Sequence, residues 1–260
     1  MTHPPDAPNH SDPAPRSDED APSPAPSPKP DDAPRQAAGF DRLKREAFDP
    51  VTFGFKLTVP RWVPWSAFGV AMLIFISYYT LDLPLTVELH DMSPALKRIT
   101  EYVTELGSST WYLLALPPLI LVAWLARRRA LAGVLLHLFL AVAAAGLLSN
   151  ALKFLFGRYR PGIYFDHGLW GFNGFELGYN VNSFPSGHSA VIGAVAAALA
   201  LALPRAWPAC LALALIVGFT RVMTGSHWLS DVIAGLYLGA LAALALRALL
   251  RDRGLYPTAK

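Results

Sequence analysis

Long stretches of apolar residues, separated by short polar segments, are the feature that most limits how this chain can fold. A helix of about 20 apolar residues is long enough to cross the hydrocarbon layer of a membrane. Six stretches approach that length: residues 62–81, 110–126, 130–156, 187–204, 207–223 and 229–250. We therefore predict an all-α protein built as a bundle of six transmembrane helices.

The N-terminal part of the chain has a different composition. Residues 1–40 are dominated by Pro, Asp, Ser and Ala, and such a segment buries too little apolar surface to offset the entropy of ordering it. We predict a disordered tail over residues 1–40 and a six-span membrane domain over residues 41–260. The tail does not resemble a secretory signal, because no apolar stretch follows a basic start.

Basic residues gather on one side of the predicted bundle. They precede the first span, separate the second from the third and the fourth from the fifth, and follow the sixth: Arg42, Lys44, Arg45, Lys56, Arg61, Arg127, Arg128, Arg129, Arg205, Arg247, Arg251 and Arg253. Because cytoplasmic loops carry the excess of Lys and Arg, both termini are expected in the cytoplasm. The net charge of +3 is too small to indicate a nucleic-acid partner.

The connections on the opposite side differ in character. Residues 82–108 place Leu96, Ile99, Val103 and Leu106 at helical spacing among polar residues, which predicts a short amphipathic helix in the membrane interface.

The only cysteine, Cys210, lies in an apolar run, so neither an intrachain disulfide nor a cysteine-rich zinc site is expected.

The other two outer connections carry polar residues suited to phosphate chemistry. Lys153 and Arg160 are seven residues apart, so they would project from one face of a helix that Pro161 then stops or bends. Farther along, Pro185-Ser186-Gly187-His188 opens the fourth span, where free backbone N–H groups and the helix dipole favour an anion.

The third group lies between the fifth and sixth spans and consists of Arg221, His227 and Asp231. The last two are four residues apart, so a carboxylate oxygen can accept one ring N–H of the histidine. The other ring nitrogen is then free to attack phosphorus. His188 would supply a proton to the leaving oxygen, while Lys153, Arg160 and Arg221 would neutralise the phosphoryl charge.

These three groups of residues together resemble the three motifs of the type 2 phosphatidic acid phosphatase superfamily. The groups are Lys153–x6–Arg160-Pro161, Pro185-Ser186-Gly187-His188 and Arg221–x5–His227–x3–Asp231. That group includes membrane lipid phosphatases, soluble bacterial acid phosphatases and vanadium haloperoxidases. The resemblance covers residues 60–250 when the six-helix layout is included. One departure is Thr220, where the family usually has Ser before the arginine, and the hydroxyl is retained.

The resemblance implies roles for eight residues. His227 would be the nucleophile, Asp231 the residue that orients it and His188 the general acid. The phosphate would be bound by five others: Lys153, Arg160, Ser186, Gly187 and Arg221. No cofactor and no metal are expected, since three basic residues can balance a phosphate dianion and no carboxylate cluster has the spacing of metal ligands.

The expected activity is metal-independent hydrolysis of a lipid phosphate monoester or pyrophosphate at the outer membrane face, through a phosphohistidine. The partners are then the bilayer and a phosphorylated membrane lipid, and the oligomeric state stays open. The alternatives are a lipid phosphotransferase that uses the same intermediate, a vanadate-dependent haloperoxidase, and a transporter or inactive lipid-binding module. Six spans argue against the haloperoxidase, and the complete set of catalytic residues argues against the inactive module.

Several other polar and aromatic residues have no expected catalytic role. His137 lies inside the third span, where a buried polar contact is expected, and His90 and His167 are expected to be exposed in loops. For Arg158 two roles remain open: a contact with substrate, or an anchor at the membrane interface. The aromatic residues of the 161–180 segment could form a belt at the membrane interface or a lid over the site, and both roles remain open.

Overall fold

A computed structural model describes residues 60–175 and 178–257 of the chain. The predicted disordered tail, residues 1–40, and the first part of the predicted membrane domain lie outside these residues. Within them the all-α prediction is confirmed, because helices and turns account for the structure and the one bridge between extended residues joins Arg158 and Phe172.

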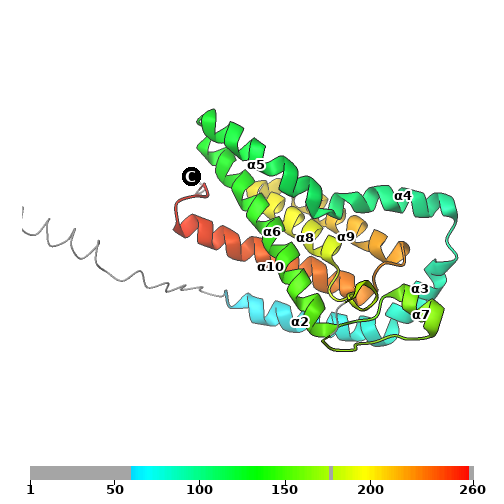
Figure 1. The fold of residues 1–260 in the computed structure, drawn as a ribbon. Coiled ribbons are helices and arrows are strands. Elements are labelled where there is room, and N and C mark those ends of the chain that lie inside the picture. Colours follow the sequence, from blue (N-terminus) through cyan, green and yellow to red (C-terminus); the bar gives the residue numbers. More distant parts are fainter. Residues whose placement is uncertain (1–59, 176–177, 258–260) are drawn as a thin grey trace, which may run out of the picture. The chain divides into compact units, whose positions relative to one another are not determined.

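Each of the six predicted spans is a helix (Figure 1). They are α2 (Trp62–Thr80), α5 (Ser109–Leu125), α6 (Arg129–Phe156), α8 (Gly187–Ala202), α9 (Trp207–Met223) and α10 (Leu229–Asp252). Four of them, α2, α6, α10 and α9 with the turn before it, are long and apolar enough to cross a membrane. The described chain therefore has the helices of a multi-pass membrane protein.

The remaining two helices are shorter than a full span. Helix α8 has 16 residues, which corresponds to about 24 Å at 1.5 Å per residue, less than the hydrocarbon thickness. Helix α5 reaches the required length only together with the segment before it, from which it is bent by 41°. The structure thus supports four spans, or five with the bent pair, where the sequence predicted six.

The predicted amphipathic segment, residues 82–108, forms two helices and a 3-10 turn in place of one helix. These are α3 (Asp82–His90), α4 (Pro94–Thr104) and η2 (Glu105–Gly107). Ser93 caps α4 with its side chain and Pro94 begins the helix, which is why the segment divides there. Leu96 and Ile99 of α4 and Leu106 of η2 are exposed, whereas Val103, predicted on the same face, packs against the buried core.

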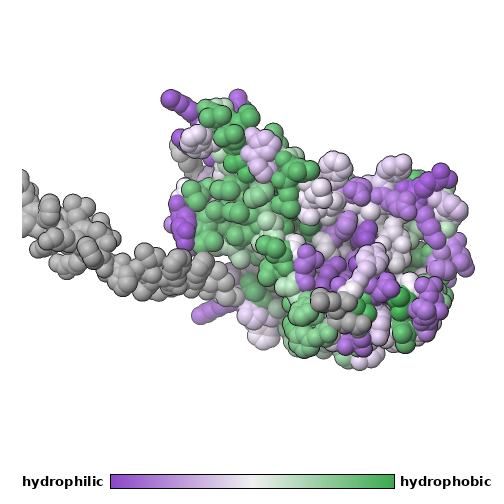
Figure 2. Space-filling model, viewed as in Figure 1, coloured by the Kyte–Doolittle hydropathy of each residue, from purple (hydrophilic) through white to green (hydrophobic). Residues whose placement is uncertain are grey.

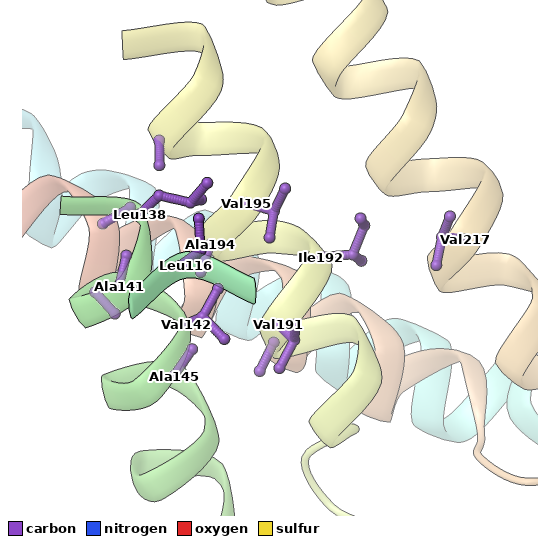
Figure 3. Close-up of a cluster of buried hydrophobic side chains, with 14 residues drawn as sticks. Leu116, Leu138, Ala141, Val142, Ala145, Val191, Ile192, Ala194, Val195 and Val217 are labelled. Atoms are coloured by element: carbon purple, nitrogen blue, oxygen red, sulfur yellow. The ribbon is translucent and has the colours of Figure 1, made fainter. Parts of the chain in front are cut away.

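Helix α8 occupies the centre of the bundle and packs against α6, α9 and α10 (Figure 3). Small side chains such as Ala141, Ala145, Ala190 and Ala194 line these contacts. The approach is so close that a Cβ atom at Gly239 of α10 would lie 2.0 Å from the carbonyl oxygen of Ala190. Small residues at such crossings let helix backbones approach, which is how helices associate where no hydrophobic effect drives them.

The surface is divided between apolar and polar regions (Figure 2). Apolar residues cover the middle of α5 and α6. Large apolar side chains of α2, α5 and α6, such as Phe68, Leu114 and Leu147, are more than 60% exposed. Hydrophilic residues gather at the end of the bundle where α3, α4 and the short helix α7 (Pro161–His167) lie. The site described next belongs to that polar end.

Candidate active site

The segment after α6 brings Arg160 to the site by a different path from the one predicted. Helix α6 ends at Phe156, and Gly157 follows in the left-handed conformation with φ 52°. A Cβ atom there would lie 1.7 Å from the carbonyl oxygen of Gly174, so only glycine fits. The prediction that Lys153 and Arg160 share a face of one helix is therefore wrong, and Pro161 begins α7 where it was expected to end the preceding helix.

His227 and Asp231 lie together at the start of α10, although His227 precedes the helix. Its Nδ1 atom is 3.5 Å from Oδ2 of Asp231 and 3.4 Å from Oγ of Ser183. The same Oδ2 accepts hydrogen bonds from Oγ of Ser183, at 2.6 Å, and from the backbone N–H of Trp228, at 3.0 Å. Both contacts of the imidazole use Nδ1, so Nε2 is the nitrogen that this arrangement leaves for chemistry.

The electrostatic environment keeps the imidazole of His227 neutral. The side chain is almost completely buried, and burial lowers the pKa of His227 to about 3. Asp231 acts in the opposite direction, while Lys153 and Arg160 add to the lowering. A neutral imidazole retains the lone pair that a nucleophile needs.

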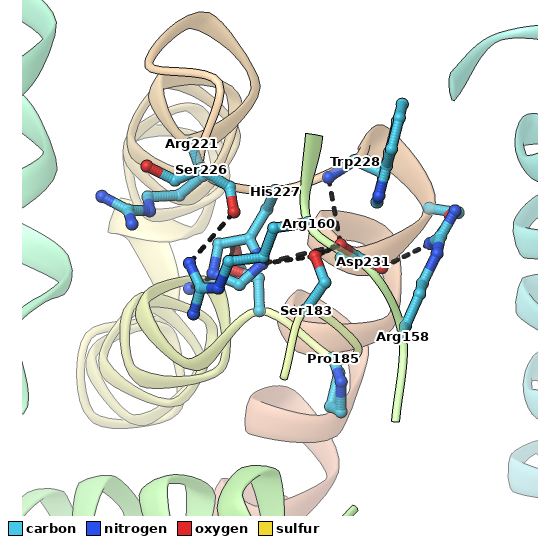
Figure 4. A network of polar contacts seen from close by, with 12 residues as sticks. Arg158, Arg160, Ser183, Pro185, Arg221, Ser226, His227, Trp228 and Asp231 are labelled. Atoms are coloured by element: carbon cyan, nitrogen blue, oxygen red, sulfur yellow. Dashed lines mark hydrogen bonds and ion pairs between the residues drawn. The ribbon is translucent and has the colours of Figure 1, made fainter. Parts of the chain in front are cut away.

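The three basic residues predicted to bind phosphate lie near this pair or near one another, since Lys153 and Arg160 act on His227 and Arg221 acts on Lys153. Lys153 lies beside the start of α8, with its Nζ atom 3.9 Å from the position of a Cβ atom on Gly187. Arg160 donates hydrogen bonds to the carbonyl oxygens of Tyr179 and Asn182, at 2.8 and 3.4 Å. It also donates to the carbonyl oxygen of Ser226, at 3.2 Å (Figure 4). Burial lowers the pKa of Arg160, yet a guanidinium stays charged at neutral pH.

Arg221, the third cation, is held at two points. Its carbonyl oxygen accepts the backbone N–H of His227 at 3.1 Å, and its Nη1 donates to Oγ1 of Thr104 at 3.1 Å. The Nε atom is buried and has no hydrogen-bond partner within the described chain. A buried donor without an acceptor is costly, and an oxygen of a bound phosphate would satisfy it.

The start of α8 carries the remaining predicted residues. His188 lies close enough to Lys153, Arg160 and Arg221 for their charges to act on it. Ser186 is fully buried and caps the helix, since its Oγ accepts from the backbone N–H and the hydroxyl of Ser189. All eight predicted site residues thus gather at one end of the bundle, with the side chain of Ser186 engaged in capping.

Two charged residues with no assigned role take part in the same network. Arg158 is fully buried and forms ion pairs with Asp231 and with Asp82, which is also fully buried (Figure 4 shows the first pair). This excludes the interfacial anchor considered for Arg158. Asp82 directly follows the first apolar stretch. Its position as a carboxylate at the end of a span is the sequence feature that could have indicated a role in the site.

The aromatic segment after α7 packs on the protein at several points. Trp170 stacks on Tyr78 with ring centroids 4.9 Å apart, and Phe172 lies 5.7 Å from the same ring. The guanidinium of Arg160 lies 4.0 Å from the ring centroid of Tyr179.

Two other histidines make contacts of their own. His90 stacks on Phe165. His137 makes the buried contact expected of it, a 2.7 Å hydrogen bond to the carbonyl oxygen of Ala243.

Comparison with known proteins places this site in a family. Residues 134–255, which contain all eight predicted site residues, match the family model described as PAP2 superfamily. This part of the chain belongs to the PAP2 superfamily. The resemblance drawn from the three motifs is thereby confirmed.

Individual relatives of this chain are phosphatases by name. A lipid A 1-phosphatase of Rhizobium johnstonii is 48% identical over 108 residues, which cover 42% of this chain and 44% of that protein. A putative undecaprenyl-diphosphatase of Escherichia coli, YbjG, is 29% identical over 146 residues, covering 53% and 68%. The chain thus spans less than half the length of the rhizobial relative.

The fold has a counterpart among solved structures. The crystal structure of LpxE from Aquifex aeolicus superposes with a TM-score of 0.50 at 24% identity, covering 65% of this chain and 96% of that one. At this level of identity the similarity concerns the arrangement of helices.

Proposed function

We propose that this protein hydrolyses a lipid phosphate monoester or pyrophosphate without a metal, through a phosphohistidine formed on His227. The observation that carries the proposal is the buried pair of His227 and Asp231, with Nδ1 facing the carboxylate and the charges of Lys153 and Arg160 acting on the imidazole. The PAP2 match over residues 134–255 and the phosphatase names of the relatives support the same chemistry.

In the first step, Nε2 of His227 forms a bond to phosphorus while the bond from phosphorus to the lipid oxygen breaks. His188 gives its proton to that oxygen, so the lipid leaves as an alcohol or, from a pyrophosphate, as a monophosphate. Asp231 stabilises the positive charge that the imidazole acquires. Lys153, Arg160 and Arg221 balance the charge on the phosphoryl oxygens as the bonds exchange.

In the second step, water attacks the phosphohistidine and His188 accepts its proton. The bond between nitrogen and phosphorus breaks, and inorganic phosphate leaves with His227 restored. A lipid hydroxyl in place of water would make the protein a phosphotransferase, which is the alternative function. The intermediate is common to both, so the acceptor distinguishes them.

The expected topology follows from the positions of the basic residues. Arg127, Arg128 and Arg205 lie in the turns at the end of the bundle away from the site, and Arg251 and Arg253 lie at the end of α10. By the positive-inside rule that end faces the cytoplasm, and the site opens to the outer surface. A lipid can then keep its tails in the bilayer while its head group enters between the helix ends.

The decisive experiment measures phosphate release by the purified protein in detergent, with excess EDTA throughout. The panel contains lipid A, undecaprenyl diphosphate, phosphatidic acid and phosphatidylglycerophosphate, and the His227→Gln variant is the control. Release from at least one lipid, absent in the variant, supports hydrolysis without a metal. A phosphorylated lipid product without free phosphate supports the alternative, and activity that needs an added divalent ion refutes the metal-independent mechanism.

A further inference from the structure

Arg158 links two carboxylates in the interior of the site. Its Nη1 atom donates to Oδ1 of Asp231 and to Oγ of Ser230, the latter at 2.6 Å, while Nη2 donates to Oδ2 of Asp82 at 2.7 Å. All three charged side chains are fully buried. The guanidinium of Arg158 therefore connects Asp231, which faces His227, to Asp82, a carboxylate from a distant part of the sequence.

Asp82 is itself fixed by the two helices between which it lies. Its Oδ1 accepts from Oγ of Ser77 near the end of α2, at 2.9 Å, and from the backbone N–H of Ser230 at the start of α10, also at 2.9 Å. Its Oδ2 accepts from Oγ of Ser230 in addition to Arg158. Both carboxylate oxygens of Asp82 thus accept hydrogen bonds. Because Asp82 is held in place, the side chain of Arg158 that binds it has little freedom to move.

Aromatic rings enclose the same guanidinium. The Cζ atom of Arg158 lies 5.0, 5.1 and 5.5 Å from the ring centroids of Tyr78, Phe172 and Trp228. Cations over aromatic faces are favourable in sites that exclude water. This packing fixes the plane of the guanidinium, and with it the direction in which Nη1 meets Asp231.

The two oxygens of Asp231 have separate partners as a result. Oδ1 is taken by Arg158, and Oδ2 receives Ser183, the backbone of Trp228 and Nδ1 of His227. Rotation of the carboxylate would break bonds on both sides at once. Buried ion pairs stabilise a fold poorly in comparison with apolar packing, so the three buried charges indicate a requirement for orientation.

We propose that Arg158 and Asp82 are positioning residues for the nucleophile. They keep the Asp231 carboxylate charged and turned so that Oδ2 faces Nδ1, which fixes the tautomer of His227 with Nε2 free for attack. This inference rests on the proposed function, in which Nε2 attacks phosphorus. Neither residue is assigned a contact with substrate.

The test uses Arg158→Lys, which keeps the charge but cannot bridge two carboxylates, and Asp82→Asn, which keeps the size and removes the charge. Arg205→Lys, the same chemical change at an exposed residue of the turn between α8 and α9, is the matched control. For each full-length protein in detergent, we would measure kcat and KM on the lipid that the unmodified protein hydrolyses. The inhibition constant of inorganic phosphate and the Tm complete the set.

The expected result is a fall in kcat of about ten- to hundredfold in both site variants, as small displacements of reacting groups cause. KM and the inhibition constant of phosphate should stay within about twofold, because the phosphate-binding side chains are untouched. The Arg205→Lys control should match the unmodified protein. An unchanged kcat in either folded site variant, or failure of both variants to fold, would overturn the positioning role.

A second readout is independent of turnover. Histidine labelled with ¹⁵N reports by NMR which ring nitrogen carries the proton, and His227→Gln assigns the signal. We expect the Nδ1–H tautomer in the unmodified protein and a mixture in both site variants. If no lipid is hydrolysed while the tautomer changes as expected, the proposed function fails and the positioning role stands. If lipids are hydrolysed and the tautomer is unchanged in the variants, only the positioning role fails.

Discussion

The Nη1 atom of Arg221 donates a hydrogen bond of 3.1 Å to Oγ1 of Thr104, although 117 residues separate the two in the chain. This contact ties the amphipathic helix α4 to a side chain of the candidate phosphate site. Close by, a Cβ atom on Gly107 would lie 2.9 Å from the carbonyl oxygen of His188. The segment from α4 to η2, which the sequence placed in the membrane interface, also forms one wall of the site.

Replacing Thr104 by Val tests that wall. Valine has nearly the same shape but cannot accept the hydrogen bond, so Arg221 loses one of its two fixed points. We expect kcat/KM for a lipid phosphate to fall about three- to tenfold, corresponding to about 1 kcal/mol for one hydrogen bond. Thr100→Val is the control, because the Thr100 hydroxyl bonds to the carbonyl oxygen of Lys97 within α4. Equal losses in both variants would contradict the prediction.

Replacing His227 by Ala tests the nucleophile. We expect phosphate release to fall below detection while Tm stays close to that of the unmodified protein, because the Asp231 carboxylate keeps its other partners. Labelled phosphate from the substrate should be trapped on the unmodified protein after an alkaline quench and be absent from the variant. His167→Ala, at an exposed histidine of the same end, should behave as the unmodified protein. Undiminished turnover of His227→Ala would exclude the assignment.

The low pKa of His227 predicts how stability depends on pH. Burial lowers this pKa to about 3, from an ordinary value near 6.5. Above pH 6.5 the imidazole is neutral in the folded and unfolded states. Between pH 6.5 and 3 the unfolded state binds one proton more, so stability is lost as the pH falls, by about 1.4 kcal/mol per unit.

The measurement compares thermal unfolding between pH 7 and 5 for the unmodified protein and His227→Gln. The other histidines are common to both, so their contributions cancel. We expect the Tm of the variant to decline less steeply with falling pH. Parallel curves would show that the imidazole of His227 is not held neutral by the fold.

The close approach of α10 to α8 at Gly239 gives a prediction about folding. A Cβ atom at Gly239 would lie 2.0 Å from the carbonyl oxygen of Ala190 and 2.6 Å from the backbone nitrogen of Ala194. Because neither backbone can yield without moving α8, we expect Gly239→Ala to lower stability by about 3 kcal/mol or to prevent folding. Gly146→Ala adds a methyl group in open space and should have little effect. Tm values in detergent that do not differ between the two would contradict the observed packing.

Orientation in the membrane is tested by labelling single cysteines in a Cys210→Ser background. Leu169 is exposed near the site, and Arg128 lies in the turn between α5 and α6. We expect an impermeant thiol reagent added to intact cells to label Leu169→Cys and not Arg128→Cys. A permeant reagent should label both, which controls for reactivity. The reverse pattern would invert the topology and leave the chemistry at His227 unaffected.

Local pattern was sufficient for the helices and for the candidate residues. Within residues 60–175 and 178–257, apolar runs located the six long helices to within a few residues, because a helix in lipid must satisfy its backbone hydrogen bonds internally. The same patterns overestimated the number of full spans. Helix α8 is enclosed by α6, α9 and α10, so its length of 16 residues does not have to match the bilayer.

The sequence by itself determined the residue types that phosphate chemistry needs and the order of the helices that carry them. Only the tertiary structure decided how those residues meet. Arg160 approaches Lys153 across a glycine turn, Thr104 reaches Arg221 from another helix, and Arg158 joins Asp82 to Asp231. Such pairings depend on the packing of segments far apart in the chain, 117 residues for Arg221 and Thr104 and 148 residues for Ser230 and Asp82, which hydrophobic periodicity does not encode. A buried ion pair needs both partners in place, so a lone Arg or Asp at a span end carries no sign of its partner.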